Sequence, residues 1–590
     1  MPKLYNSTQT GKFIFFAYAM IGIAFLFVVQ LLLKKEIKIK LSVLDILLFV
    51  LLAYIIINRY FIQDIYSFSL RFYELIGLAV LYVVLRSIPR KYYIFFLLAV
   101  ITGGIIQAVY GNLQLLGFYN SFNANFKMTG TFFNPGPYAG YLAAIFPLAL
   151  GIYLFRNKLI EELPVVQSMP QWLRQILLEY LPLAGILSIL LVLPASRSRA
   201  AWLAAGLSST LLLAIKYQFK YHFNRIFNEI YKKLIALSLL VLLTAGSLYG
   251  IYVFKKNSAD GRLLIWTVSA NIIKDYPLFG VGFDRFKAHY MNYQATYFQD
   301  QPESKYAMVA DNVQYAFNEV LQFFVENGLL GGLLAFAVFA YVIYHVNFRQ
   351  TTLSIIIIGL LSIISFSLFS YPSHILPLML ILMILMSLSN EVLGNNYLTG
   401  NFSNMKMGIQ VRSFCSIIIL FGIGYSVISI NKLSLIYKNW YVANRAYNFG
   451  MYEEGIKYYK KSYAQLLRNG EFLQHYGKAL SMAENHENAI DVLEEAAKHY
   501  NTTITHTTLG DSYQLALDLK NSEESYMQAY YMVPNRFYPK YLLAKLYDKT
   551  GQRLKAVRIA EEIVKKNYKI NSTAIYEIKR EMKFLLQNNL

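Results

Sequence analysis

Arginines in short polar turns are the side chains of this sequence with the clearest chemical purpose. Arg197 and Arg199 lie in the turn Ser196–Trp202 between two apolar runs, and Arg262 begins a short amphipathic segment. A guanidinium group grips phosphate oxygens through paired hydrogen bonds, so a pyrophosphate at a membrane surface is a natural ligand for Arg197 and Arg199. A salt bridge within the chain is the alternative.

Acidic residues gather where a long polar segment returns to an apolar run. In order, the segment contains Asp311-Asn312, Phe317-Asn318-Glu319 and Glu326-Asn-Gly328-Leu-Leu-Gly331. Glu319 and Glu326 are seven residues apart and therefore share one face of a helix. Carboxylates beside a membrane span are costly and tend to be functional. For Glu326, helix capping with solvation at the headgroup level is the alternative.

Two further stretches combine glycine, proline and aromatic residues and predict shaped loops. The first, Thr129–Tyr141, contains Asn134 and leads into an apolar run, where an ordinary helix start is the alternative. The second, Asp275–Phe283, carries two glycines that permit a tight backbone return. No strand precedes it, so it is not a dinucleotide-binding loop. The sequence shows no nucleophilic Ser/His/Asp set, P-loop or metal-ligand cluster, so we expect no hydrolase or ATPase, no metal and no other cofactor.

The composition indicates that a lipid bilayer surrounds these motifs. Of the 590 residues, 56% are hydrophobic and 15% are charged, whereas a soluble domain carries about 25% charged residues. The net charge is +21, but Lys and Arg gather in short loops between apolar runs, as membrane topology requires. No DNA- or RNA-binding motif accompanies them, so nucleic acid is not an expected partner. The single cysteine, Cys415, excludes an intrachain disulfide.

Apolar runs of about 20 residues predict an all-α, polytopic membrane domain over residues 1–431. We count twelve candidate spans, at approximately 13–33, 41–58, 70–86, 92–112, 137–155, 178–194, 200–216, 233–254, 328–346, 352–370, 373–391 and 412–430. The first run is too long for a cleaved signal peptide and is expected to be a retained helix. The third and fourth spans are interrupted by Glu74 and Gln107.

The distribution of positive charge predicts which loops face the cytoplasm. The cationic loops near residues 34–40, 86–91 and 216–233 all fall on one side of the predicted membrane. The opposite side then receives the motifs described above, the long loop 255–327 and everything after Lys432. With twelve spans, the N-terminus lies on that outer side too.

Residues 432–590 contain an internal sequence repeat. Aligning Gly455, Ala489, Ser522 and Ala556 gives spacings of 34, 33 and 34 residues by subtraction, and a second small residue stands twelve positions before each: Ala443, Gly477, Gly510 and Ala544. This spacing predicts four tetratricopeptide helix–turn–helix units that stack into an α-solenoid, with small residues where paired helices touch. Such repeats usually bind peptides or partner proteins, and a rigid appendage that supports the membrane domain is the alternative.

In their order along residues 120–390, the four motif stretches resemble the superfamily of O-antigen ligases, O-antigen polymerases and bacterial protein O-oligosaccharyltransferases. The resemblance implies a GT-C-like bundle in the bacterial inner membrane, with the repeats in the periplasm. It implies an enzyme that transfers a glycan from an undecaprenyl-diphosphate carrier to an acceptor hydroxyl, with inversion at the anomeric carbon and without a metal. By the same resemblance, Arg199 and Arg262 bind the donor diphosphate beside Arg197, and Asn134 shapes the site.

One position departs from the family pattern. The family motif at the membrane re-entry is His, then Asn, Ser or Gln, then nine residues, a glycine, two residues and a small or aromatic residue. Here Asn318, Gly328 and Gly331 match this spacing, but Phe317 stands at the histidine position. Phenylalanine cannot accept a proton, so another group must serve, or the activity differs, or it is lost.

A carboxylate is the first candidate for the missing base. Glu319 adjoins the motif, and a carboxylate at a membrane edge can have its pKa raised toward neutrality; Asp311 is the second choice. His289 and His374 could also titrate near neutral pH, although a lone histidine is more often structural. A strong base is dispensable if the arginines stabilise the departing diphosphate, because that leaving group already makes the donor reactive.

We therefore expect ligase-type transfer, with lipid A–core as the acceptor and membrane lipids around the protein. Polymerisation on a second carrier-linked glycan and transfer to protein Ser or Thr are the alternatives within the class. A peptide-binding repeat domain on the side of the site favours a protein acceptor or a partner protein. An alternative from another class is a non-catalytic scaffold that recruits envelope proteins through its repeats, and Phe317 supports it.

Overall fold

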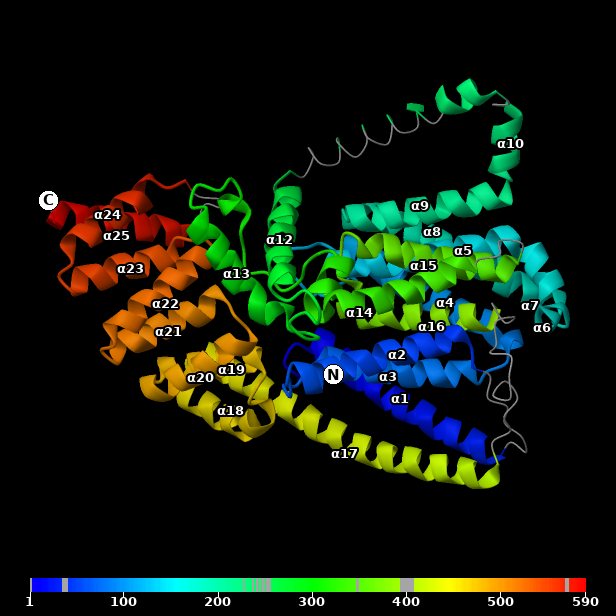
Figure 1. Ribbon diagram of the computed structural model, residues 1–590, viewed down its shortest axis with the longest axis horizontal. Coiled ribbons are helices and arrows are strands. Elements are labelled where there is room, and N and C mark those ends of the chain that lie inside the picture. Colours follow the sequence, from blue (N-terminus) through cyan, green and yellow to red (C-terminus); the bar gives the residue numbers. More distant parts are fainter. Residues whose placement is uncertain are drawn as a thin grey trace.

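The protein is helical throughout the part of the chain that the structure describes. The computed structural model describes residues 3–33, 41–226, 229–235, 238–239, 242, 246, 250, 256–345, 350–392, 408–567 and 572–589, and no β-strand occurs in these ranges. The expected all-α class is confirmed. Figure 1 shows a bundle of long, roughly parallel helices at one end and stacked shorter helices at the other, with α12 (Lys256–Asp275) and α13 (Phe286–Asp300) between them.

Seven described helical segments are long and apolar enough to cross a membrane: 7–33, 43–62, 90–115, 135–162, 171–196, 319–344 and 409–448. They correspond to α1 (Ser7–Leu33), α2 (Val43–Ile57) with η1 (Asn58–Ile62), α4 (Tyr93–Leu115), α5 (Pro135–Glu162), α8 (Leu181–Val192) with the short turns before it, α14 (Glu319–Tyr344) and α17 (Ile409–Asn448). Helices α3 (Leu70–Arg86), α9 (Arg199–Lys216), α15 (Thr351–Ser367) and α16 (Leu376–Val392) occupy four further predicted spans. The span at 233–254 lies largely outside the described residues, and the total of twelve stays a prediction.

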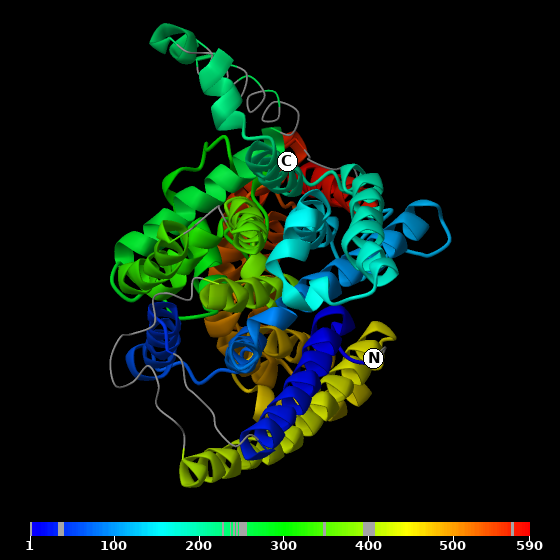
Figure 2. The same ribbon diagram turned by 90° about the vertical axis from the view of Figure 1, so that its right-hand side faces the viewer.

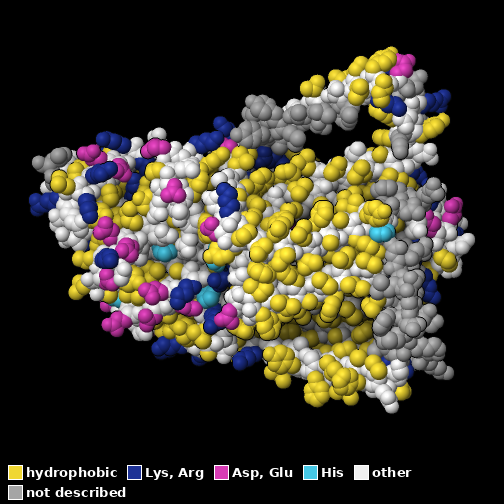
Figure 3. Space-filling model, viewed as in Figure 1, with side chains coloured by type: hydrophobic (Ala, Val, Ile, Leu, Met, Phe, Trp, Pro, Cys, Tyr) yellow, Lys and Arg dark blue, Asp and Glu magenta, His cyan; other side chains and the backbone are white. Residues whose placement is uncertain are grey.

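Helix α5 forms the centre of the bundle. It packs against α4, α8, α9 and α15, and most of its side chains are buried. Small residues allow this close approach, since a Cβ on Gly140 would lie 2.2 Å from the ring of Phe366. The outer surface of the bundle is a broad expanse of apolar side chains, whereas charged side chains gather over the repeats (Figure 3). This distribution is typical of a protein embedded in lipid.

Helices α1 and α17 run side by side, although they come from opposite ends of the chain (Figure 2). The hydroxyl of Tyr18 donates to Asn431 Oδ1 at 2.6 Å, and the ring of Tyr5 stacks on Trp440 at 3.9 Å. The N-terminus therefore lies at the end of the bundle that carries the repeats. This placement requires an even number of membrane crossings between the two.

The repeats follow α17 without interruption, since this one helix crosses the predicted domain boundary at residue 431. Helical hairpins then pack in series: α18 (Tyr452–Leu466), α19 (Gly470–Met482) with α20 (His486–His499), α21 (Thr503–Leu515) with α22 (Leu519–Met532), α23 (Tyr538–Lys549) with α24 (Arg553–Lys565), and α25 (Thr573–Asn589). The predicted small residues lie between paired helices: a Cβ on Gly477 would meet Leu493 at 2.5 Å, and one on Gly510 would meet Tyr526 at 2.3 Å. Their assignment to the tetratricopeptide family stays a prediction.

The repeats are bonded directly to the loop that returns to the membrane. Asn535 donates its side-chain amide to the carbonyl oxygens of Ala307, Met308 and Ala310 at 3.1, 3.3 and 2.7 Å. Gln294 on α13 donates to the carbonyl of Met532 in α22. The repeat domain therefore holds the re-entry loop in a defined position.

Candidate functional site

The turn at residues 277–282, here called the glycine turn, packs against a break in α14. At Gly328 the helix adopts φ 63° and ψ −168°, which is not helical. The backbone N–H of Leu329 donates to Pro277 at 2.8 Å, and those of Val281 and Gly282 donate to Val325 and Glu326 at 2.9 Å. A Cβ on Gly328 would lie 2.2 Å from the carbonyl oxygen of Leu278. The glycines of two separate motifs are thus needed for one close backbone contact.

Polar side chains at the end of α2 hold this turn from the other side. Asn58 and Gln63 donate to the carbonyl oxygens of Phe279 and Gly280, both at 2.9 Å. The side chain of Arg59 is 1% exposed and donates to Phe283 at 2.9 Å. This Asn-Arg-Tyr-Phe-Ile-Gln segment was not among the residues predicted from the sequence. Its position directly after an apolar run was the available signal.

A buried ionic cluster lies under the first turn of α14. The Arg71 guanidinium donates to both carboxylate oxygens of Glu326, at 2.8 and 2.6 Å, and to Ser373 Oγ at 2.8 Å. Glu319 lies 3.6 Å from Arg71 and accepts the backbone N–H of Ser373 at 3.1 Å. Glu326 is thus the partner of a buried arginine rather than a helix cap at the membrane surface. The cluster joins α3, α14 and the segment before α16.

Asp284 extends this cluster outside the membrane spans. It accepts a hydrogen bond from Ser69 Oγ at 2.7 Å. Burial alone would raise its pKa, but the charges of Lys287 and Arg71 and the Ser69 hydrogen bond outweigh burial and hold the pKa at about 2. Asp284 is therefore ionised at neutral pH and stabilises the cationic side of the cluster.

The structure brings Arg199 and Arg262 together at the end of the bundle nearest the repeats. Arg199 is the first residue of α9, and Arg262 lies in α12. Burial and then the positive charge of Arg199 lower the pKa of Arg262. Among the described residues no carboxylate forms an ion pair with Arg262. Two cations that repel each other in a half-buried site favour an anionic ligand.

Tyr371 and Asn134 add neutral hydrogen-bond donors beside Arg262. Burial raises the pKa of Tyr371 to about 12, although the Asn134 amide and the charge of Arg262 oppose this rise. The Tyr371 hydroxyl therefore keeps its proton at neutral pH. Guanidinium, phenol and amide groups all donate to oxygen, so the set suits the oxygens of a phosphate group. Tyr371 was not predicted from the sequence.

Phe317 lies beside these hydrogen-bond donors, and its backbone conformation is strained. Its φ is 51°, an outlier for an aromatic residue. Its ring lies 5.7 Å from Arg262 Cζ and edge-on to Tyr371 at 5.3 Å, while Tyr315 stacks on Tyr371 at 4.3 Å. Asn318 follows as the N-cap of α14 and accepts the backbone N–H of Leu321 at 3.1 Å. Aromatic rings therefore occupy the place that the family gives to histidine.

The ion pairs of Glu319 and Asp311 are with arginines other than Arg199 and Arg262. The Glu319 carboxylate is held by Arg71 and Ser373, as described above. Asp311 is exposed and pairs with Arg536 of the repeat domain at 2.9 Å, so its contact is with the repeats. Arg197 is exposed in a turn with φ 51°. Gly331 packs in α14, where a Cβ would meet the ring of Tyr54 at 2.7 Å.

The two candidate histidines also have defined surroundings. Burial and the charge of Arg285 lower the pKa of His289 to about 4, so it does not titrate near neutral pH. His374 Nε2 lies 2.6 Å from Gln322 Nε2 in the ionic cluster. Among the described residues, no group of three or more His, Cys, Asp or Glu side chains is placed to hold a metal ion.

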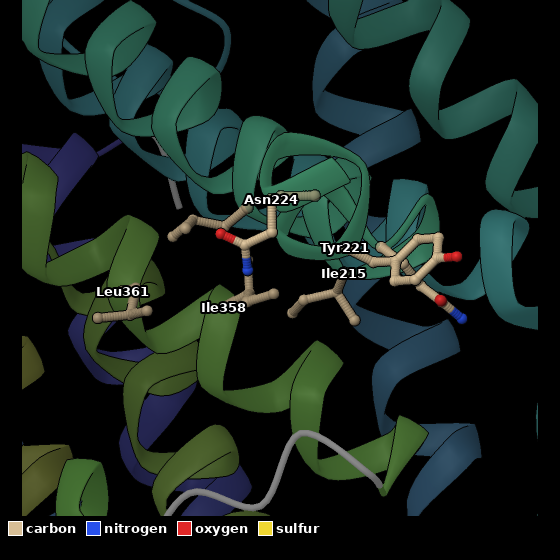
Figure 4. Close-up of a pocket in the computed structure, with 8 residues that line it drawn as sticks. Ile215, Tyr221, Asn224, Ile358 and Leu361 are labelled. Carbon is tan, nitrogen blue, oxygen red and sulfur yellow. The ribbon is translucent and has the colours of Figure 1, made fainter. Parts of the chain in front are cut away.

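An apolar cavity of about 690 Å³ lies at the other end of α9. It is formed by α9, α10 (Phe219–Ile226) and α15 (Figure 4). Ile215, Ile358 and Leu361 line it with apolar surface, and Tyr221 and Asn224 lie at its side. None of its lining residues is charged, and it lies at the end of α9 opposite Arg199, so it is separate from the arginine pair.

Comparison with known proteins agrees with the resemblance drawn from the motifs. Residues 184–336 match the model of the O-antigen ligase family. No curated protein matches the chain. The matched segment runs from α8 to the middle of α14 and contains Arg199, Arg262 and the re-entry motif from Phe317 to Gly331. Residues 184–336 of this multi-pass membrane protein are therefore similar to the O-antigen ligase family.

Proposed function

We propose that this protein transfers a glycan from an undecaprenyl-diphosphate carrier to an acceptor hydroxyl. The family match supports a glycosyl-transfer role in glycan assembly, and the lipid carrier accounts for a site at the end of a membrane bundle. The observation that carries the proposal is the convergence of Arg199, Arg262, Tyr371 and Asn134, which are donors from four separate segments. A diphosphate presents the anionic oxygens that such a set binds.

The chemistry follows from where charge develops. The acceptor oxygen attacks the anomeric carbon from the face opposite the diphosphate, the carbon–oxygen bond to the diphosphate breaks, and its electron pair leaves on the diphosphate. Arg199 and Arg262 stabilise this departing charge, and Tyr371 donates a further hydrogen bond. The acceptor proton leaves to water or to a nearby carboxylate. The configuration at the anomeric carbon is inverted.

Acceptor activation has to proceed without the family histidine. Phe317 cannot take a proton, and its ring instead lies beside Arg262. Glu319 is the nearest carboxylate along the chain and becomes the base if its contact with Arg71 loosens when the acceptor binds. In the proposed reaction, stabilisation of the leaving group therefore supplies most of the acceleration, and removal of the proton supplies less.

The proposed transfer has three possible acceptors, and each defines a different function. Ligase-type transfer to lipid A–core at the periplasmic face of the inner membrane is the first. Transfer to a second carrier-linked glycan would make the protein a polymerase, and transfer to Ser or Thr would make it a protein O-oligosaccharyltransferase. The close contact between the repeats and the re-entry loop suits a protein acceptor or partner.

The test is release of undecaprenyl diphosphate from native lipid-linked glycan by purified protein, with membrane acceptors supplied. We expect release by wild type, strong loss in Arg262→Ala, partial retention in Arg262→Lys, and no change in the control Arg558→Ala. Arg558 is 84% exposed on the repeat domain. The molecule that gains the glycan identifies the acceptor. An intact wild type that binds the donor but releases nothing would support the scaffold function, in which the repeats alone matter.

A further inference from the structure

A groove on the repeat domain lies beside the loop that leads to Phe317. It has a volume of about 330 Å³ and is formed by α19, α21 and the segment that starts α23. Small-molecule sites range from about 300 to 1,000 Å³, so this groove has the size of a small ligand rather than of a folded partner. We refer to this space as the repeat groove.

The lining of the repeat groove is rich in hydroxyl groups and carries net positive charge. Its polar lining includes Lys478, Ser481, Thr503, Thr507, Thr508 and Arg536. The one lining carboxylate, Asp511, already accepts a hydrogen bond from the Tyr526 hydroxyl at 2.6 Å. Arg536 already pairs with Asp311 at 2.9 Å, whereas among the described residues no carboxylate forms an ion pair with Lys478, so Lys478 is the cation that faces the space.

We propose that the repeat groove binds a negatively charged saccharide. Lys478 would bind its carboxylate, and the Ser and Thr hydroxyls would bond to its ring hydroxyls. Tyr538, which is 49% exposed, offers a flat apolar face for the sugar ring. None of the residues that line the groove is Asn or Gln, the side chains that best serve the alternating donors and acceptors of a peptide backbone. The lining thus favours a sugar over an extended peptide.

The position of the groove connects it with the candidate site. Arg536 pairs with Asp311 at 2.9 Å, and Asn312 donates to Thr503 Oγ1 at 3.0 Å. Asp311 precedes Phe317 by six residues, a length of chain that spans at most about 20 Å. A short oligosaccharide held at the arginine pair therefore reaches the repeat groove. The choice of a saccharide as ligand rests on the proposed glycan transfer. Binding to the repeat groove is measured without turnover, so the failure of this binding and the failure of glycan transfer can be told apart.

The experiment measures binding to the full-length protein in lipid nanodiscs by saturation-transfer NMR and calorimetry. The probes are a hyaluronan tetrasaccharide, neutral chitotetraose and tetraglutamate peptide. The variants are Lys478→Gln and Thr508→Val, and the control Lys520→Gln removes the same charge from an exposed position outside the groove. Unchanged thermal unfolding shows that each variant keeps its fold.

We expect the acidic tetrasaccharide to bind wild type and the control equally, and to bind Lys478→Gln at least about tenfold more weakly. Thr508→Val should weaken binding by a few-fold, and the neutral sugar should bind more weakly than the acidic one. Equal binding of the neutral sugar would overturn the role of Lys478 in binding a carboxylate. Binding of the peptide instead of the sugar, or no binding at all, would overturn the proposal.

Discussion

Replacing Gly328 by alanine would put a methyl group where the carbonyl of Leu278 already lies. The new Cβ would be 2.2 Å from that oxygen and 2.5 Å from the backbone nitrogen of Phe279, both of which are backbone atoms that cannot rotate away. The backbone at Gly328, with φ 63° and ψ −168°, is a conformation that essentially only glycine adopts. The glycine turn and α14 must therefore separate.

The cost follows from these contacts. Holding alanine in this conformation costs about 1–3 kcal/mol. Separation also breaks the four backbone hydrogen bonds that join the turn to the α14 break, each with a net contribution of about 0.5–1.5 kcal/mol. The total is about 3–9 kcal/mol, a large part of the stability of a typical domain.

The assay compares thermal unfolding and diphosphate release for wild type, Gly328→Ala and the control Gly206→Ala. Gly206 lies in α9, and a Cβ added there would have no neighbouring atom within 4 Å, so alanine should be neutral or stabilise the helix by up to about 1 kcal/mol. We expect a Tm several degrees lower and loss of release only for Gly328→Ala. A Gly328→Ala protein that unfolds and reacts like wild type would refute the close contact between the two motifs.

Three further predictions concern the charged and aromatic groups of the site. Glu326→Gln leaves Arg71 buried with its main partner neutralised, which should lower the free energy of unfolding by about 3–5 kcal/mol. The double variant Arg71→Met with Glu326→Leu should recover much of this loss. An equally unstable double variant would contradict the assignment of the loss to an unpaired buried charge. Phe317→Ala removes the ring beside Arg262, a contact of about 0.5–2 kcal/mol, so donor KM should rise about 2- to 30-fold while Phe317→Tyr stays near wild type. The pKa of Asp284 is about 2 in the folded protein, below its unfolded value, so its stabilisation is present above about pH 4 and is lost as the pH falls toward 2. Asp284→Asn should remove that part of the pH dependence of Tm, and an unchanged pH profile would show that Asp284 is not the titrating group.

The sequence by itself determined the elements and several of the contacts within them. Apolar runs predicted helices at every span that the structure describes, because a bilayer demands long uninterrupted apolar segments. Small residues at a regular spacing predicted where the repeat helices touch, because only small side chains permit that distance. Arg199 was predicted to bind an anion because a cation in such a turn needs an anionic partner, and Arg262 was predicted from the resemblance to the family motif.

The tertiary structure alone decided which polar groups meet. Glu326 pairs with Arg71 across 255 residues of sequence, and no periodicity or local spacing reveals such a pairing. Tyr371 reaches Arg262, and Asp311 reaches Arg536 instead of the arginine pair, because the loops that carry them are placed by α14 and by the repeats. Helix formation depends on neighbours along the chain, whereas the partner of a buried charge depends on how distant helices pack.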